Sequence, residues 1–285
     1  MSRMGDVLAG FHAAWEFESD SVLIRYERGI RTPKLFQALG ERRVPLEAIA
    51  GVTLAQGKRG TVVLRAELRD GADPLLEAAA GQLKEGCDPY RLVLPAEKET
   101  LAEYYADELR AALDGGGPVD GYLVAAPEAP RQFKAYDAKA SFDGRTVSFR
   151  WFWTGASSAK WKAGDQSFPV TELSGVQWRS PEVFEGHLRL VLRDGATVPA
   201  QPDQDPAAVV FGLGYGPVHE SLPFAAAVLA AVRESGPAAV VPAAGPRRDP
   251  ADIAERIRPL GELHQAGLVT DEEFSSKKAE LLAEL

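Results

Sequence analysis

Short segments in which apolar and polar residues alternate recur along the first 234 residues of this chain. Alternation with a period of two, combined with β-branched and aromatic side chains, is typical of strands that bury one face. Residues 14–18 and 22–26 are two such segments, and the polar turn at 19–21 predicts a hairpin between them. Asp143-Gly144 predicts a second hairpin, because Asp-Gly is a preferred turn between strands.

Further strands are expected at 42–49, which runs into a turn, and at 51–54, 61–68, 90–94 and 207–211. Arg69-Asp70-Gly71 closes one of them, and we expect Gly71 to take a positive φ there.

Tryptophans and phenylalanines are concentrated in the second half of the chain. Phe149, Trp151 and Trp153 alternate, so we expect all three on one buried strand face, and we place Trp15 and Trp178 in the core as well. The neighbouring cations at 160 and 162 leave stacking on nucleic-acid bases as the alternative.

Helical spacing replaces alternation at three places before residue 235. Asp73 and Pro74 have the residue types of an N-cap and a first helical residue, which predicts a short helix within 73–84. Ser221 is the expected N-cap of a helix over 222–232, with Pro223 in its first turn. The remaining helix has an apolar stripe of Leu101, Tyr105, Leu109 and Leu113.

The chain contains an internal repeat with an offset of 124 residues. Val-Pro-Leu-Glu-Ala-Ile-Ala-Gly-Val at 44–52 returns as Phe-Pro-Val-Thr-Glu-Leu-Ser-Gly-Val at 168–176. The strand end and turn at 64–72 return at 188–196 with the same offset. A fixed offset over apolar and turn positions indicates that one structural unit has been copied.

Each copy has several antiparallel strands followed by one amphipathic helix. We therefore expect an α+β fold that is mainly β, with two tandem split β-barrels, each closed by its C-terminal helix. The expected boundaries are a first domain at 11–113, a linker at 114–133, a second domain at 134–234, a Pro/Ala-rich linker at 235–248 and a helical hairpin at 249–285.

The C-terminal segment has the pattern of two short amphipathic helices. Asp249-Pro250 begins the first, Gly267 ends it, and Thr270 with Glu273 forms a capping box for the second. A hairpin of this size buries too little apolar surface to be stable alone, so we expect it to dock on a partner. The apolar residues expected to do so are Ile253, Ile257, Leu260, Leu263, Leu268, Phe274, Leu281 and Leu282.

The element order, the Pro-Leu-x-x-Ile-x-Gly-Val segment and the Leu-Arg…Asp-Gly strand end resemble the bacterial PH-like fold. The tandem arrangement is similar to the family called domain of unknown function 4429. Residues 260–282 resemble the short C-terminal domain known as SHOCT. The first resemblance implies two PH-like modules, and the last implies a role in oligomerisation or partner binding.

Composition narrows the classes of function. The 285 residues carry a net charge of −9, and none of the expected domains is basic, which disfavours bulk binding to nucleic acid. A single cysteine excludes an internal disulfide, and four scattered histidines have no metal-ligand spacing. We expect a cytoplasmic protein without a cofactor, and the absence of catalytic motifs favours a protein that is not an enzyme.

Basic residues cluster around the second and third strands of the first copy: Arg25, Arg28, Arg31, Lys34, Arg42 and Arg43. Several cations converging on one phosphate cluster would hold an anionic lipid headgroup. The other interpretation is a solvated basic edge that discourages pairing between sheets.

The favoured hypothesis is a binding and assembly protein that forms a homo-oligomer or docks a protein partner through its C-terminal hairpin. A peripheral membrane protein that uses the basic edge of the first domain is the alternative, and an enzyme with a site between the repeats is left open.

Overall fold

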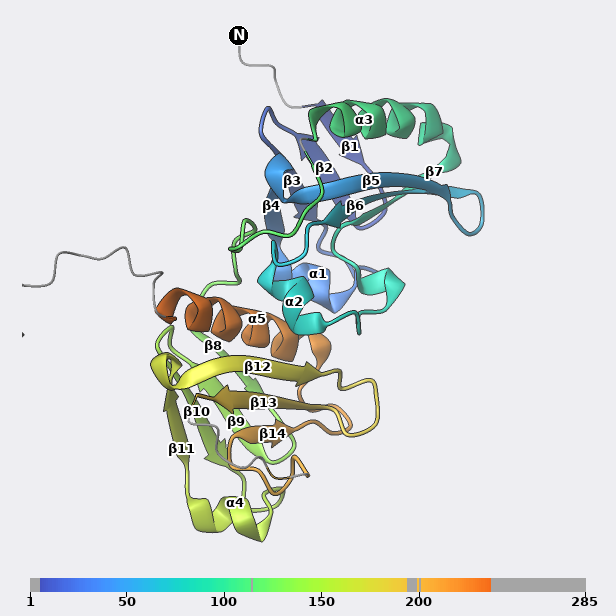
Figure 1. Ribbon diagram of the computed structural model, residues 1–285. Helices are drawn as coiled ribbons and strands as arrows, with labels where there is room; N and C mark the ends of the chain where they lie inside the picture. The colour runs from blue at the N-terminus through green and yellow to red at the C-terminus, as the bar shows by residue number, and fades with distance from the viewer. Residues whose placement is uncertain (1–5, 114, 194–198, 200, 237–285) are drawn as a thin grey trace, which may run out of the picture. The chain divides into compact units, whose positions relative to one another are not determined.

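The computed structural model describes residues 6–113, 115–193, 199 and 201–236, and within this range each repeat contains two antiparallel sheets and a closing helix (Figure 1). In repeat 1, the first sheet has the order β1-β2-β3-β4 and the second the order β5-β6-β7. The strands are β1 (Asp6–Ala9), β2 (Ala13–Phe17), β3 (Ser21–Tyr26), β4 (Glu41–Pro45), β5 (Ile49–Gln56), β6 (Thr61–Leu68) and β7 (Arg91–Pro95). The helices are α1 (Lys34–Leu39), α2 (Pro74–Ala79) and α3 (Glu99–Ala112), with short 3₁₀ turns η1 (Leu46–Ala48), η2 (Glu85–Cys87) and η3 (Ala96–Lys98).

Repeat 2 follows the same order, and its described residues contain no counterpart of α2. Its sheets run β11-β10-β9-β8 and β12-β13-β14. The strands are β8 (Arg131–Lys134), β9 (Ala138–Phe142), β10 (Thr146–Trp151), β11 (Gln166–Pro169), β12 (Leu173–Arg179), β13 (His187–Leu192) and β14 (Ala208–Val210). The helices are α4 (Ser158–Ala163) and α5 (Val218–Ser235), and η4 (Val170–Glu172) joins the two sheets.

The repeated sequence block forms the corner between the two sheets in both copies. In each copy a proline ends a strand, a 3₁₀ turn follows, and the next strand begins with an irregular register, between Ile49 and Gly51 or between Leu173 and Gly175. Gly71 has φ of +80°, which confirms the expected turn. The equivalent Asp194-Gly195 lies outside the described residues.

Two hairpins and helix α2 confirm the predictions from sequence. β2 pairs with β3, and β9 pairs with β10 across Asp143-Gly144. The Asp73 carboxylate accepts from the backbone N–H groups of Leu75 and Leu76, so this residue is the N-cap of α2. That helix ends at Ala79, where Ala80 adopts a left-handed conformation.

The N-terminal strands β1 and β8 were not expected from sequence. They form edges of the first sheets and begin before residues 11 and 134, where the two domains were expected to start.

Three expectations about side chains and caps are wrong. Trp153 is 82% exposed, because β10 ends at Trp151 and the chain turns away, whereas Phe149, Trp151, Trp15 and Trp178 are buried as expected. Leu101 is 43% exposed, because the buried face of α3 is set by Ala102, Tyr105, Ala106 and Leu109. Ser221 lies inside α5, which begins one turn earlier at Val218 after Pro217.

Ser221 does not cap the helix but connects it to neighbouring elements. Its hydroxyl accepts from Trp178 Nε1 at 3.0 Å and donates to the carbonyl of Gly216 at 2.9 Å, so it ties α5 to β12 and to the loop before the helix.

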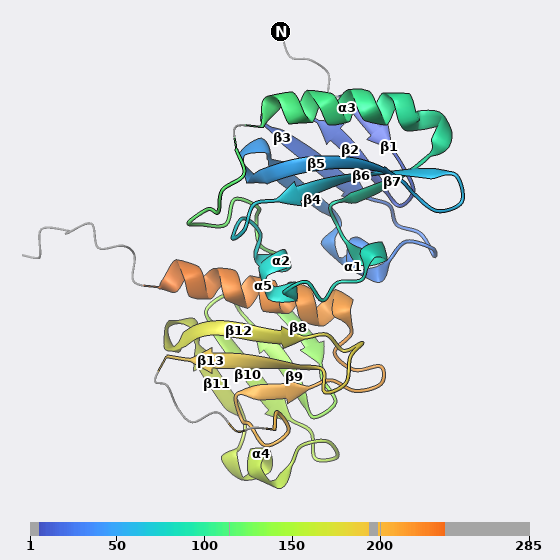
Figure 2. The same cartoon turned by 45° about the vertical axis from the view of Figure 1, so that its right-hand side comes forward.

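Helix α5 lies between its own repeat and repeat 1, with α1 and α2 on one side and the sheets of repeat 2 on the other (Figures 1 and 2). Leu35 of α1 and Leu75 of α2 share one hydrophobic core with Leu222 and Phe224 of α5. Most of α5 is therefore buried around its whole circumference, whereas α3 keeps one face in solvent. The larger core of the protein thus spans both repeats.

Polar contacts add to this shared core. Gln82 Nε2 donates to the carbonyl of Trp178 at 2.9 Å, and Gln82 Oε1 accepts from the N–H of Ser180 at 2.9 Å. Lys84 forms an ion pair with Glu182 at 2.8 Å. The segment after α2 therefore fastens repeat 1 to β12 and to the turn that follows it.

Candidate binding groove

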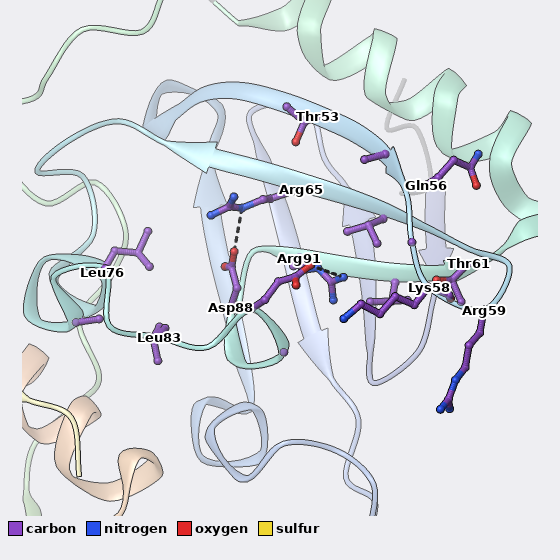
Figure 3. Close-up of a pocket in the computed structure, with 18 residues that line it drawn as sticks. Thr53, Gln56, Lys58, Arg59, Thr61, Arg65, Leu76, Leu83, Asp88 and Arg91 are labelled. Carbon is purple, nitrogen blue, oxygen red and sulfur yellow. Dashed lines mark hydrogen bonds and ion pairs between the residues drawn. The ribbon is translucent and has the colours of Figure 1, made fainter. Parts of the chain in front are cut away.

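A large groove lies on the outer face of β5, β6 and β7 (Figure 3). Its volume is about 1160 Å³. Thr53, Arg65 and Arg91 form its floor because alternate residues of a strand point to the same side of the sheet. We call this surface the β5–β7 groove.

One end of the β5–β7 groove is apolar. Leu76 of α2 and Leu83 of the following loop lie there, away from the β5–β6 turn (Figure 3). Both residues belong to α2 and the loop after it, and the described residues between β13 and β14 of repeat 2 contain no such helix.

The other end is cationic. Lys58 and Arg59 form the tip of the turn between β5 and β6, and both side chains are exposed (Figure 3). Arg59 and Gly60 have φ of +57° and +69°, and Thr61 Oγ1 donates to the carbonyl of Lys58 at 2.7 Å. These constraints hold the two cations at the rim of the groove.

The charges in the middle of the groove are paired. Arg65 lies 2.9 Å from the Asp88 carboxylate, and Arg91 lies 3.0 Å from Glu85 (Figure 3). The first pair has a counterpart in repeat 2, where Arg189 lies 2.8 Å from Asp205. Asp88 and Asp205 also both accept from the backbone two residues later, so this pair belongs to the common scaffold.

The features particular to the groove are therefore its apolar wall and its two cations. Together they can hold a ligand segment with an apolar part and a carboxylate or phosphate group. The equivalent β12–β13 turn of repeat 2 has the opposite character, with Glu182, Glu185 and an 82% exposed Phe184. Sequence reasoning missed the groove, although Gly57-Lys58-Arg59-Gly60 is a recognisable basic turn enclosed by glycines.

The six basic residues predicted as an anionic-ligand edge do not form one cluster. Arg25 pairs with Glu16 and Glu41, and Arg43 pairs with Glu18. Arg28, Arg31 and Lys34 are exposed in and next to the loop between β3 and α1. Arg42 is buried, which contradicts its placement on a solvated edge.

Arg42 belongs to a buried network inside repeat 1. Its guanidinium donates to Asp73 Oδ1 at 2.7 Å and to the Tyr90 hydroxyl at 2.9 Å, and that hydroxyl donates to Asp73 Oδ2 at 2.6 Å. Burial raises the pKa of Tyr90 well above its usual value, so the phenol stays protonated and acts as a donor. Tyr26 completes the group by donating to the carbonyl of Pro89.

Repeat 2 has a different buried ion pair. Lys160 Nζ lies 2.6 Å from Asp137 Oδ2 and 5.0 Å from the centre of the Trp151 ring. Asp137 Oδ1 accepts from the N–H of Val210, which joins the two sheets of the repeat. Burial raises the pKa of Asp137 and lowers that of Lys160, because desolvation opposes both charges. Both buried networks hold elements together, and neither lines the β5–β7 groove.

In the described part of the chain, no group of three or more His, Cys, Asp or Glu side chains is placed to hold a metal ion. No helix in the same residues is long and apolar enough to cross a membrane. The predicted docking residues Ile253, Ile257, Leu260, Leu263, Leu268, Phe274, Leu281 and Leu282 lie outside the described residues.

The family model "Domain of unknown function (DUF4429)" matches residues 15–110 and 140–229. The chain belongs to this family. The two matched segments fall one on each repeat. They begin within β2 and within β9 and extend into the closing helix, so β1 and β8 lie outside them. No match was found among curated proteins.

Proposed function

We propose that this DUF4429 protein is a non-enzymatic, cytoplasmic binding and assembly protein built from two PH-like modules. Four strands in one sheet, three in the next and a terminal helix occur in both repeats, which supports the resemblance to PH-like modules. The β5–β7 groove carries the proposal, because it combines an apolar wall with two exposed cations and contains no nucleophile beside a general base. This arrangement suits recognition of a protein segment that bears apolar and acidic side chains.

The groove is tested by comparing the proteins that full-length variants retain from an extract of the native cells. Lys58→Glu with Arg59→Glu reverses the charge at the rim without touching the paired Arg65 or Arg91. We expect a specific captured protein to be lost from this variant and kept by the control Arg145→Glu with Lys162→Glu, which changes two exposed cations of repeat 2. Identical capture by all three proteins would remove the groove from the proposal.

The C-terminal segment at 249–285 provides the assembly function in this proposal. Its support is the resemblance to SHOCT and an apolar pattern too short to be stable alone. Light scattering of the full chain should give a higher mass than a chain that ends at Ser235, which retains the whole of α5. Equal monomeric masses would exclude self-association, and the capture experiment would then decide whether a different protein is bound.

The second candidate function is binding to anionic lipid headgroups, and the loop between β3 and α1 favours it. Ile30 is fully exposed at the tip of this loop, between the exposed cations Arg28 and Arg31. An exposed apolar side chain among cations is a common arrangement for contact with an anionic membrane surface.

Cosedimentation with vesicles of phosphatidylcholine, with and without phosphatidylglycerol, tests this second candidate. Arg28→Ala with Arg31→Ala should weaken binding to the anionic vesicles, and Ile30→Ser should do so even at higher salt. The control Arg145→Ala with Lys162→Ala should bind as the wild type does. Absence of wild-type binding at low salt would eliminate this candidate.

A further inference from the structure

Three cations lie side by side on the outer face of the first sheet of repeat 2. Lys134 of β8 is directly opposite Lys139 of β9, and Lys139 is directly opposite Arg150 of β10. Phe149 and Trp151 on either side of Arg150 are buried, so these cations point to the other face, away from the core. We call them the cation row.

The same positions in repeat 1 show that this charge is not required by the fold. There the register places Ala9 opposite Ala14, and Ala14 opposite Arg25. Only the arginine is common to both copies, and the two alanines are replaced by lysines in repeat 2.

The acidic partners of the shared arginine also differ. In repeat 1, Arg25 pairs with Glu16 and Glu41. In repeat 2 the position in β9 that corresponds to Glu16 is occupied by Ser141. Asp165, just before β11, accepts from the backbone N–H of Trp151. Among the residues that the structure describes, no carboxylate lies within ion-pair distance of Lys134, Lys139 or Arg150.

Such a row is unfavourable by itself. Directly opposed residues in neighbouring strands have Cα atoms about 5 Å apart, and like charges at that spacing repel. The cost is reduced when an anion lies over the row and contacts several of the cations at once.

The neighbouring row offers hydroxyl donors beside the cations. Ser141, Ser148 and Ser167 are directly opposite one another on β9, β10 and β11, on the same face of the sheet. Three adjacent cations with hydroxyl groups beside them match the charge and the acceptor oxygens of clustered phosphates better than a single carboxylate.

We propose that the cation row and its adjoining serines bind a phosphate-bearing ligand on the open face of β8–β11. The ligand is a soluble polyphosphate or a phosphorylated lipid headgroup, since both present clustered phosphate oxygens to a flat surface. This site lies in repeat 2 and uses none of the residues of the β5–β7 groove, so it stands independently of the function proposed above.

The test uses the full chain and two probes, inorganic tripolyphosphate and phosphatidylcholine vesicles that contain phosphatidylglycerol. Lys134→Ala with Lys139→Ala is the decisive variant, because it gives β8 and β9 the alanines that repeat 1 has at these positions. The control is Arg145→Ala with Lys162→Ala, which removes the same charge from exposed positions outside the row. Thermal melting confirms that both variants fold.

We expect the decisive variant to lose about tenfold or more in affinity and the control to change by less than about twofold. Binding of tripolyphosphate alone identifies a soluble ligand, and binding of vesicles alone identifies a headgroup. Equal affinity of wild type and decisive variant would overturn the proposal, as would absence of binding to both probes. Tighter binding of polyglutamate than of tripolyphosphate would also overturn it, because the face would then select carboxylates.

Discussion

Arg42 and Asp73 form an ion pair of 2.7 Å inside repeat 1, with 4% and 0% of their side chains exposed. The pair joins β4 to the start of α2, which is the helix that packs on α5. An interaction within repeat 1 therefore holds the helix that connects the two repeats.

Removing the charge of Asp73 tests this relationship. Asp73→Asn keeps a side-chain cap for α2 but leaves the Arg42 guanidinium buried without its counterion. We expect the free energy of unfolding to fall by about 3 kcal/mol in urea titrations. The double variant Arg42→Met with Asp73→Asn should lose less, because it leaves no buried charge without a partner. A loss as large as the single variant's would show that the unpaired guanidinium is not the cause.

The closing helices should respond differently to loss of one leucine. Leu222 of α5 is fully buried in the core shared by both repeats, whereas Leu101 of α3 is 43% exposed. Leu222→Ala is expected to lower the free energy of unfolding by about 2–5 kcal/mol, and Leu101→Ala by less than about 1 kcal/mol. Equal losses in chemical denaturation would contradict the burial of α5 between the repeats.

Gln82 should matter more than its neighbour Lys84. Gln82→Ala leaves the carbonyl of Trp178 and the N–H of Ser180 without their side-chain partner, at an expected cost of about 1–3 kcal/mol. Lys84→Ala removes an exposed ion pair with Glu182, which we expect to cost less than about 1 kcal/mol. The comparison is made by thermal melting of the two variants, and the reverse order would refute the role given to Gln82.

Lowering the pH should destabilise the protein already at pH values above those at which most carboxylates become protonated. Burial lowers the pKa of His187 and His219 below their usual 6.5. The unfolded chain then binds more protons than the folded chain, so the free energy of unfolding decreases as the pH falls below about 6.5 and through the lower folded-state pKa.

Urea midpoints at about pH 7.5 and about pH 5.5 measure this effect. Replacing His187 by Gln should reduce the difference between the two midpoints, while the exposed Arg145→Ala should leave it unchanged. A difference that is the same in wild type and His187→Gln would exclude His187 as its source.

The sequence alone was sufficient for features set by neighbouring residues. The Asp143-Gly144 hairpin, the positive φ of Gly71 and the Asp73 cap depend on local conformation and hydrogen bonding, and all three are confirmed. Trp153 was misplaced because alternation continues past Trp151 in the sequence, whereas the strand does not.

Features that depend on contacts between residues far apart in the chain could not be predicted from the sequence. The burial of Arg42 depends on Asp73, 31 residues away, and the cation row depends on the register of three strands. The apolar run 222–228 did carry a signal, since a helix that is apolar on all sides must be covered on all sides. What covers α5 could not be read from that run.

The contrast between α3 and α5 limits how many of these units can stack. Repeat 1 covers α5 with α1 and α2, but α3 presents the acidic residues Glu103, Asp107 and Glu108 to solvent. The part of repeat 2 that the structure describes contains no counterpart of α2 with which to cover another helix. Repeat 1 therefore acts as a terminal cap in the sense used for solenoid proteins, where a polar outer face ends the array. A third unit could be added at α3 only if its surface and that of the helix were both rebuilt.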